Sequence, residues 1–125
     1  MKLGVCYYPE QWPEERWPVD AQMMVDAGLE YVRIAEFAWA LMEPAEGRFV
    51  WGWLDRAIDA LAGAGLKVIL GTPTATPPAW LTTAHPEMLH VDANGRARKH
   101  GTRRQACVNN GTYRVYSSRI VTEMA

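Results

Sequence analysis

The chain has 125 residues, of which 49% are hydrophobic and 22% are charged, a composition that suits one globular domain and excludes disorder. Thirteen basic and fourteen acidic residues give a formal net charge of -1, so no overall field attracts nucleic acid or an anionic membrane. Neither a signal peptide nor a membrane-spanning run is recognisable, and we expect a soluble, cytoplasmic protein with no nucleic-acid or membrane partner.

The spacing of apolar residues predicts strands that alternate with helices. In chain order, the expected elements are a buried strand at residues 3–8, a helix at 17–29, a strand at 31–35, a helix at 53–62, a strand at 66–71, a short helix at 79–83 and a helix at 113–125. Gly28 and Gly65 each stand where a helix ends and turns into a strand. Crossover helices require a parallel sheet, because a tight turn cannot join parallel strands.

The third predicted strand would present an unpaired edge, which folded proteins normally cover or pair. A complete barrel of eight strands takes roughly 250 residues. We therefore expect an α/β fold made of the first three β/α units of a (β/α)8 TIM barrel, incomplete at the C-terminus, with residues 1–125 as one truncated domain. A small doubly wound domain is disfavoured, because the turn after the first strand has none of the glycines of a phosphate-binding turn.

Active sites of such barrels lie at the C-terminal ends of the strands. The polar and aromatic residues that follow the three strands are Tyr8, Glu10 and Trp12, then Glu36, Phe37 and Trp39, then Thr72, Thr74 and Thr76. Hydroxyls, carboxylates and flat rings, without a Ser/His/Asp series or a paired histidine motif, are typical of a carbohydrate site.

Three charged residues near the second strand allow more than one interpretation. Arg33 either keeps a neighbouring carboxylate ionised or forms a structural salt bridge. Glu36 either accepts hydrogen bonds from sugar hydroxyls or pairs with an arginine, whereas Glu43 is expected to brace its own loop. A catalytic pair made of Glu36 and Glu43 is disfavoured, since both lie on one strand-loop segment.

A long loop is expected between the short helix at 79–83 and the last helix, and a basic stretch lies within it. It consists of Arg96, Arg98, Lys99, His100, Arg103 and Arg104. Such a run is usually solvated surface, although a loop over the barrel mouth can turn one arginine inward. Cys107 follows the stretch, and the other cysteine, Cys6, is too distant in a chain without a secretory signal to suggest a disulfide. Cys107 is a free thiol or a metal ligand, but a zinc site needs about four ligands and none stands at a suitable spacing nearby.

Five motifs follow one another along the chain, at residues 4–12, 32–39, 43–47, 51–55 and 71–81. Their order and spacing resemble those of glycoside hydrolase family 42 β-galactosidases over essentially the whole chain. The resemblance implies a retaining hydrolase of terminal β-D-galactosides that works through a galactosyl-enzyme intermediate and needs no cofactor for catalysis. Its acid/base and nucleophile glutamates would lie after Ala125, so the chain is expected to contain no catalytic residue and to be inactive alone.

The resemblance also implies roles for individual residues. Arg103 matches the family's arginine contact to galactose, and we expect Glu36 and Trp39 to join it in binding substrate, with Arg33 as support. Cys107 matches a cysteine that in many members binds zinc with three cysteines of a later loop, which this chain lacks. Family members are often trimers, so a homotrimer is expected for a full-length protein. The alternative is a non-catalytic sugar-binding or scaffold domain derived from a TIM barrel.

Overall fold

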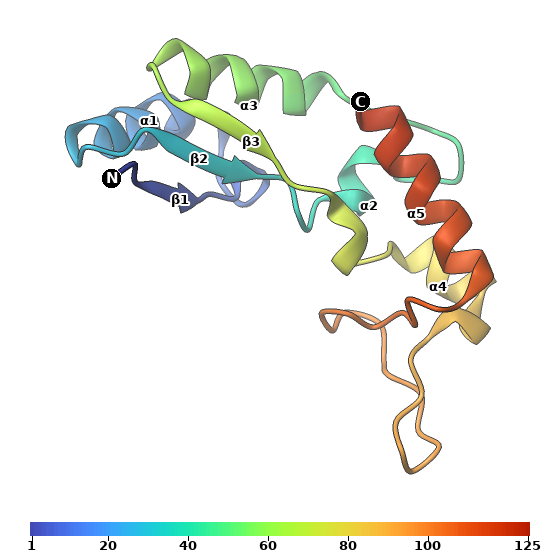
Figure 1. Ribbon diagram of the computed structural model, residues 1–125. Coiled ribbons are helices and arrows are strands. Elements are labelled where there is room, and N and C mark those ends of the chain that lie inside the picture. The colour runs from blue at the N-terminus through green and yellow to red at the C-terminus, as the bar shows by residue number, and fades with distance from the viewer. The chain divides into compact units, whose positions relative to one another are not determined.

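The computed structural model describes all 125 residues and contains one parallel sheet. Its strands, in the order β1-β2-β3, are β1 (Gly4–Cys6), β2 (Tyr31–Ile34) and β3 (Lys67–Leu70) (Figure 1). Val5, Val32 and Val68 stand side by side across the sheet. The α/β class and the succession of parallel β/α units are as the sequence predicts.

The contacts of the chain divide it into two compact units, which we describe separately. Unit 1 comprises residues 1–35 and 51–71, and unit 2 comprises residues 36–50 and 72–125. No helix of the structure is both long and apolar enough to cross a membrane.

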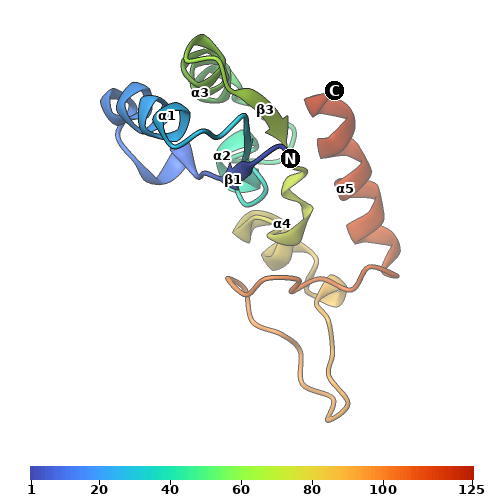
Figure 2. The same ribbon diagram turned by 60° about the vertical axis from the view of Figure 1, so that its left-hand side comes forward.

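Unit 1 holds the sheet and the helices α1 (Trp17–Asp26) and α3 (Gly52–Gly63), with the short 3-10 turns η1 (Pro9–Gln11) and η2 (Glu14–Arg16) before α1. The two helices pack against each other and lie on the same side of the strands (Figure 2). They bury Val32 and Ile34 completely, which stabilises the unit by about 1.5–3 kcal/mol per side chain.

The glycines that follow the two helices, Gly28 and Gly65, adopt the left-handed backbone conformation that commonly ends a helix. Gly28 has a φ of 78° and Gly65 a φ of 94°, a region in which a side chain would be strained. Gly4 is needed for a different reason, because a Cβ at this position would come within 2.9 Å of Tyr31 on the neighbouring strand. Close pairing of β1 with β2 therefore requires glycine at position 4.

The expectation of a buried first strand is wrong. Leu3 is 47% exposed and Val5 40% exposed, and Ile69 of β3 is 47% exposed. β1 and β3 are the two edges of the sheet, and the helices of unit 1 cover only one of its faces. Apolar runs predicted strands correctly, but burial on both faces depends on layers that unit 1 does not contain.

Unit 2 is built from helices and loops. It contains α2 (Trp39–Met42), η3 (Pro73–Ala75), α4 (Ala79–Ala84), η4 (Pro86–Met88) and α5 (Gly111–Met124). Asn110 caps α5 by accepting a hydrogen bond from the Tyr113 N–H at 3.0 Å. The core of the unit contains Trp39, Met42, Leu81, Met88 and Ile120, all without exposed surface.

The long segment between η4 and α5 has only isolated antiparallel bridges, Leu89 with Ala106 and Val91 with Ala97. It forms the extended orange loop in Figure 1. The absence of a helical or strand period in this part of the sequence therefore predicted irregular structure correctly. The predicted helix at residues 113–125 is α5, in which Ile120 is fully buried and Val121 is 36% exposed.

Candidate functional site

The chain turns sharply where β2 ends. Ala35, the next residue, has a φ of 77° and no exposed surface. This left-handed conformation costs a residue with a Cβ about 1–2 kcal/mol, and such strain is concentrated at functional sites. Glu36 follows directly and is 9% exposed.

Arg103 reaches the segment that carries Glu36. Its guanidinium carbon lies 4.4 Å from the centroid of the Phe37 ring, although the two residues are far apart in sequence. The Thr76 hydroxyl donates to the Phe37 carbonyl at 3.3 Å and holds the backbone of the same residue. A guanidinium on an aromatic face contributes about 0.5–1 kcal/mol at an exposed site, and it leaves the N–H edge of the arginine for other partners.

Trp39 lies behind this surface rather than on it. The ring has no exposed area, and its Nε1 donates to the Glu43 carboxylate at 2.9 Å. A sugar could not lie against this ring without displacing the loop around it. The sequence predicts that Trp39 binds substrate. In this structure the ring is buried and contacts Glu43, and the substrate-binding role stays a prediction.

Glu43 braces its loop, as the sequence suggests. The side chain has no exposed surface and accepts hydrogen bonds from the Gly47 N–H at 2.8 Å and from the Trp39 indole. The Arg119 guanidinium pairs with the same carboxylate. The Trp80 indole donates to the Glu43 carbonyl at 2.8 Å. Because its oxygens are engaged by three donors, Glu43 is unsuited to act as a nucleophile or acid.

Side chains on one face of helix α5 contact two other segments of unit 2, the one that follows β2 and the one that follows β3. Tyr113 donates to the Thr74 carbonyl at 2.8 Å, Tyr116 donates to the Glu46 carboxylate at 2.6 Å, and Arg119 pairs with Glu43. The hydrogen bond to Glu46 raises the pKa of Tyr116 above its ordinary value. The tyrosine hydroxyl therefore stays a donor well into the alkaline range.

Arg33 lies on the open face of the sheet in unit 1. It is exposed, stands between Cys6 and Ile69 in the register, and lines a shallow cavity of about 230 Å³. Val32 and Ile34 point to the opposite, helix-covered face. The position at the end of β2 suits the supporting role expected for Arg33, which stays a prediction.

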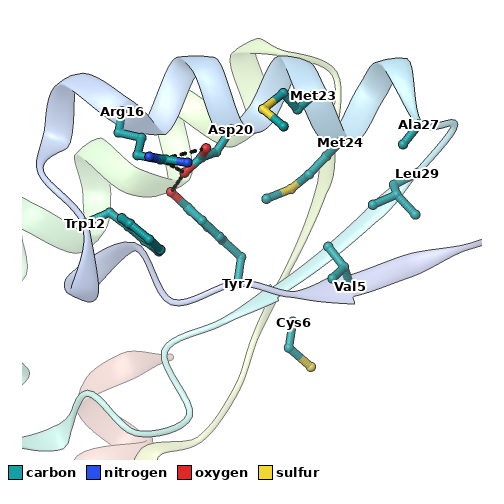
Figure 3. Close-up of a pocket in the computed structure, with 10 residues that line it drawn as sticks. All are labelled: Val5, Cys6, Tyr7, Trp12, Arg16, Asp20, Met23, Met24, Ala27 and Leu29. Carbon is teal, nitrogen blue, oxygen red and sulfur yellow. Dashed lines mark hydrogen bonds and ion pairs between the residues drawn. The ribbon is translucent and has the colours of Figure 1, made fainter.

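A second cavity in unit 1, about 360 Å³ in volume, lies between β1 and α1 (Figure 3). The Tyr7 hydroxyl donates to the Asp20 carboxylate at 2.8 Å, and the same carboxylate accepts from Arg16 at 3.0 Å. Burial, followed by the bond to Asp20, raises the pKa of Tyr7 above its ordinary value. Arg16 also stacks on Trp12, with its guanidinium carbon 4.5 Å from the ring centroid.

The polar groups of this cavity already satisfy one another, and the remaining lining is apolar, including Met23, Met24 and Leu29. Cys6 points away from α1 (Figure 3). A sugar site needs unsatisfied polar groups that converge on the ligand, so this cavity does not fit one. The cluster instead fixes the loop after β1, together with the Trp17 indole, which donates to the Pro9 carbonyl at 2.9 Å.

Cys107 is half-buried and free, and it lines the same cavity as His90. No group of three or more His, Cys, Asp or Glu side chains in the chain is placed to hold a metal ion. The residues present therefore do not fit a zinc site by themselves. Zinc binding through Cys107 stays a prediction that depends on ligands outside these residues.

Comparison with known proteins agrees with the motifs and the fold. Residues 6–125 match the model of the family Glyco_hydro_42, described as β-galactosidase. The chain belongs to this family. A β-galactosidase of Thermus thermophilus is 61% identical over 123 residues, and this match covers 98% of the chain and 19% of the relative. A β-galactosidase of Halorubrum lacusprofundi is 50% identical over 121 residues, covering 97% of the chain and 17% of the relative.

Solved structures of the family superpose closely on the chain. The β-galactosidase of the psychrophilic Marinomonas ef1 has a TM-score of 0.95 and 54% identity, with 99% of this chain and 19% of that chain covered. The β-galactosidase from Bacillus circulans sp. alkalophilus has a TM-score of 0.93 at 33% identity, and the match covers 99% of this chain and 18% of that chain. The chain thus spans about a fifth of the length of these β-galactosidases, and its parallel sheet with crossover helices is consistent with the first β/α units of a TIM barrel.

Two residues of this family 42 chain were not found by sequence reasoning. Arg119 lies in the middle of α5, and only the fold brings it to Glu43. Gln105 is 1% exposed and directly follows the basic stretch, where nothing in the local pattern indicates burial. A buried polar side chain next to an exposed charged run has no periodic signal, so a structure was required to find it.

Proposed function

We propose that the protein is a retaining β-galactosidase to which these residues contribute one wall of the galactose site. Membership of family 42 supports the substrate class. The observation that carries the proposal is the placement of the Arg103 guanidinium on the ring of Phe37, the residue that follows Glu36 in the chain. A guanidinium donates hydrogen bonds and a carboxylate accepts them, so Arg103 and Glu36 supply the two kinds of partner that sugar hydroxyls need.

The proposed reaction needs two carboxyl groups about 5–5.5 Å apart, one as nucleophile and one as acid/base. In the first step the nucleophile forms a bond to the anomeric carbon while the acid/base group protonates the departing glycosidic oxygen. In the second step water attacks the anomeric carbon and breaks the galactosyl ester, and the acid/base group, now a carboxylate, accepts a proton from that water. Glu43 is unsuited to either role because its carboxylate is buried and bonded to three donors. We propose, as the family resemblance implies, that both catalytic glutamates lie after Ala125.

The test compares residues 1–125 with the complete reading frame that encodes them, using p-nitrophenyl β-D-galactoside as substrate. We expect nitrophenol release from the complete protein and none from residues 1–125. Galactose-inhibited turnover by residues 1–125 would overturn the placement of the catalytic pair. Galactose binding without turnover by both proteins would instead establish the alternative, a non-catalytic sugar-binding domain.

The contribution of the wall is tested with single variants of the complete protein. Arg103→Ala is expected to lower kcat/KM by about 10- to 100-fold, since a hydrogen bond to a charged group is worth about 1.5–3 kcal/mol. Arg96→Ala is the matched control, because Arg96 belongs to the same basic stretch and is exposed. Equal activity of the two variants would show that Arg103 does not bind substrate.

We also propose Cys107 as a zinc ligand in the complete protein, and a homotrimeric assembly. Elemental analysis of the purified protein and of Cys107→Ser measures the first, and sedimentation measures the second. Equal zinc content in both proteins would remove Cys107 from the metal site.

A further inference from the structure

Gln105 is a buried amide at the base of the loop that carries Arg103. Its side chain accepts a hydrogen bond from the Gly101 N–H at 2.7 Å and donates to the Pro77 carbonyl at 2.9 Å. The Nδ1 of His100 lies 3.5 Å from the same amide nitrogen. A buried primary amide is costly unless its donors and acceptor are satisfied, so these bonds favour one loop geometry.

The two bonds of Gln105 close the loop and attach it to a neighbouring segment. The bond to Gly101 spans residues 101–105, and the bond to Pro77 holds them against the segment that carries Thr76. Arg104 adopts a φ of 54°, and its N–H donates to the Ala75 carbonyl at 2.9 Å. A non-glycine residue keeps this left-handed conformation only where its surroundings enforce it.

The loop therefore fixes the backbone of Arg103, while Phe37 receives its guanidinium. Arg98 adds two bonds of 3.3 Å to the carbonyls of Arg103 and Arg104, but these are longer and exposed, and so weaker than the buried bonds of Gln105. An arginine held in this way does not have to be ordered by the ligand. Preorganisation of this kind increases affinity because less conformational entropy is lost on binding.

We propose that Gln105 is the positioning residue for Arg103: it does not touch the substrate, and it orients the guanidinium that does. The proposal rests on the proposed function of Arg103. Its effect is expected mainly on KM, because a misplaced arginine weakens the binding of substrate and transition state alike.

Two substitutions in the complete protein test the proposal. Gln105→Met keeps the size of the side chain but removes both bonds, and we expect it to raise the KM for p-nitrophenyl β-D-galactoside by about tenfold with a smaller change in kcat. Gln22→Met, at an exposed glutamine of α1, is the matched control and should leave KM unchanged.

Gln105→Glu adds a readout that a general loss of stability would not reproduce. The introduced carboxyl offers Pro77 a donor only when it is protonated, whereas it can accept from the Gly101 N–H in either state. The KM of this variant, divided by that of the parent, should therefore fall as the pH is lowered. For Gln105→Met the same ratio should not change with pH. A ratio for Gln105→Glu that is also independent of pH would contradict the proposed bonds.

A double-mutant cycle separates this proposal from the function on which it rests. In an Arg103→Ala background, Gln105→Met should change KM by less than about twofold, because the group that it positions is already absent. Equal effects of Gln105→Met in both backgrounds would overturn the positioning role while leaving Arg103 as a substrate ligand. An unchanged kcat/KM in Arg103→Ala alone would instead refute the role of Arg103 as a substrate ligand, on which this proposal rests.

Discussion

Replacing Arg119 by methionine removes a guanidinium from a carboxylate that has no exposed surface. Arg119 pairs with Glu43, whose remaining donors are the Trp39 indole at 2.9 Å and the Gly47 N–H at 2.8 Å. Methionine retains much of the length of the side chain and its packing. The substitution therefore tests mainly the loss of the charge-assisted bond between α5 and the loop after β2.

The magnitude follows from the burial of the two partners. Breaking a fully buried ion pair costs about 3–5 kcal/mol, whereas an exposed pair is worth about 0–1 kcal/mol. The Arg119 side chain is 32% exposed and Glu43 0%, so the pair lies between these limits. Because two donors remain on Glu43, we expect the free energy of unfolding to fall by about 2 kcal/mol. Arg119 also lies 3.7 Å from the Glu46 carboxylate, but the Glu46 side chain is 58% exposed, so this pair adds little to the free energy of unfolding.

Urea unfolding is the suitable assay, because guanidinium chloride would screen the ion pair. Arg114→Met, at an exposed position of the same helix, is the control and should change stability by less than about 0.5 kcal/mol. A cycle with Glu43→Gln should give a coupling of at least about 1 kcal/mol, since both changes remove the same pair. A loss for Arg119→Met no larger than the control would refute the argument that burial strengthens this interaction.

Three further changes test unit 1. The raised pKa of Tyr7 stabilises the fold below the ordinary tyrosine pKa of about 10, and this contribution is lost as the pH rises through the native pKa. At neutral pH, Tyr7→Phe should lower the free energy of unfolding by about 1 kcal/mol, because the hydrogen bond to Asp20 is lost. Above about pH 10, the free energy of unfolding of the variant should decrease less with pH than that of the parent, as measured by urea titrations. Gly4→Ala, whose Cβ would meet the neighbouring strand at 2.9 Å, should lower the free energy of unfolding by about 1–3 kcal/mol in the same assay. Arg56→Met should raise the pKa of Glu14, which the hydrogen bond from Arg56 now lowers; an unchanged carboxyl titration by NMR would show that this bond is absent in solution.

Sequence motifs were sufficient to identify the family and the order of the elements. The alternation of apolar runs with glycine-ended helices predicted β1, α1, β2, α3 and β3 within a few residues of their observed bounds. These features are local: a period of apolar residues or a glycine after a helix acts on its own neighbourhood, whatever the rest of the chain does. The expected bracing role of Glu43 also follows from local context, since Gly47 lies only four residues away.

Side-chain burial was less predictable. The apolar run at residues 3–8 indicated a buried strand, but the edges of the sheet leave Leu3 and Val5 exposed. Trp39 looked suited to stacking on a sugar, and packing in unit 2 removed its ring from the surface. Both outcomes depend on which layers cover a residue, and a one-dimensional pattern does not contain that information.

What the sequence determined by itself is the family, the parallel β/α succession and the expectation that Arg103 and Glu36 belong to one site. The tertiary structure decided how the segments that carry these two residues are held. Ala35 adopts a left-handed conformation, Arg103 lies on Phe37, and two buried polar side chains, Glu43 and Gln105, fix the surrounding loops. Gln105 and Glu43 acquire their partners Pro77 and Arg119 only through the path of the folded chain. Contacts between residues far apart in sequence leave no periodic trace, because they arise from packing rather than from local conformational preference.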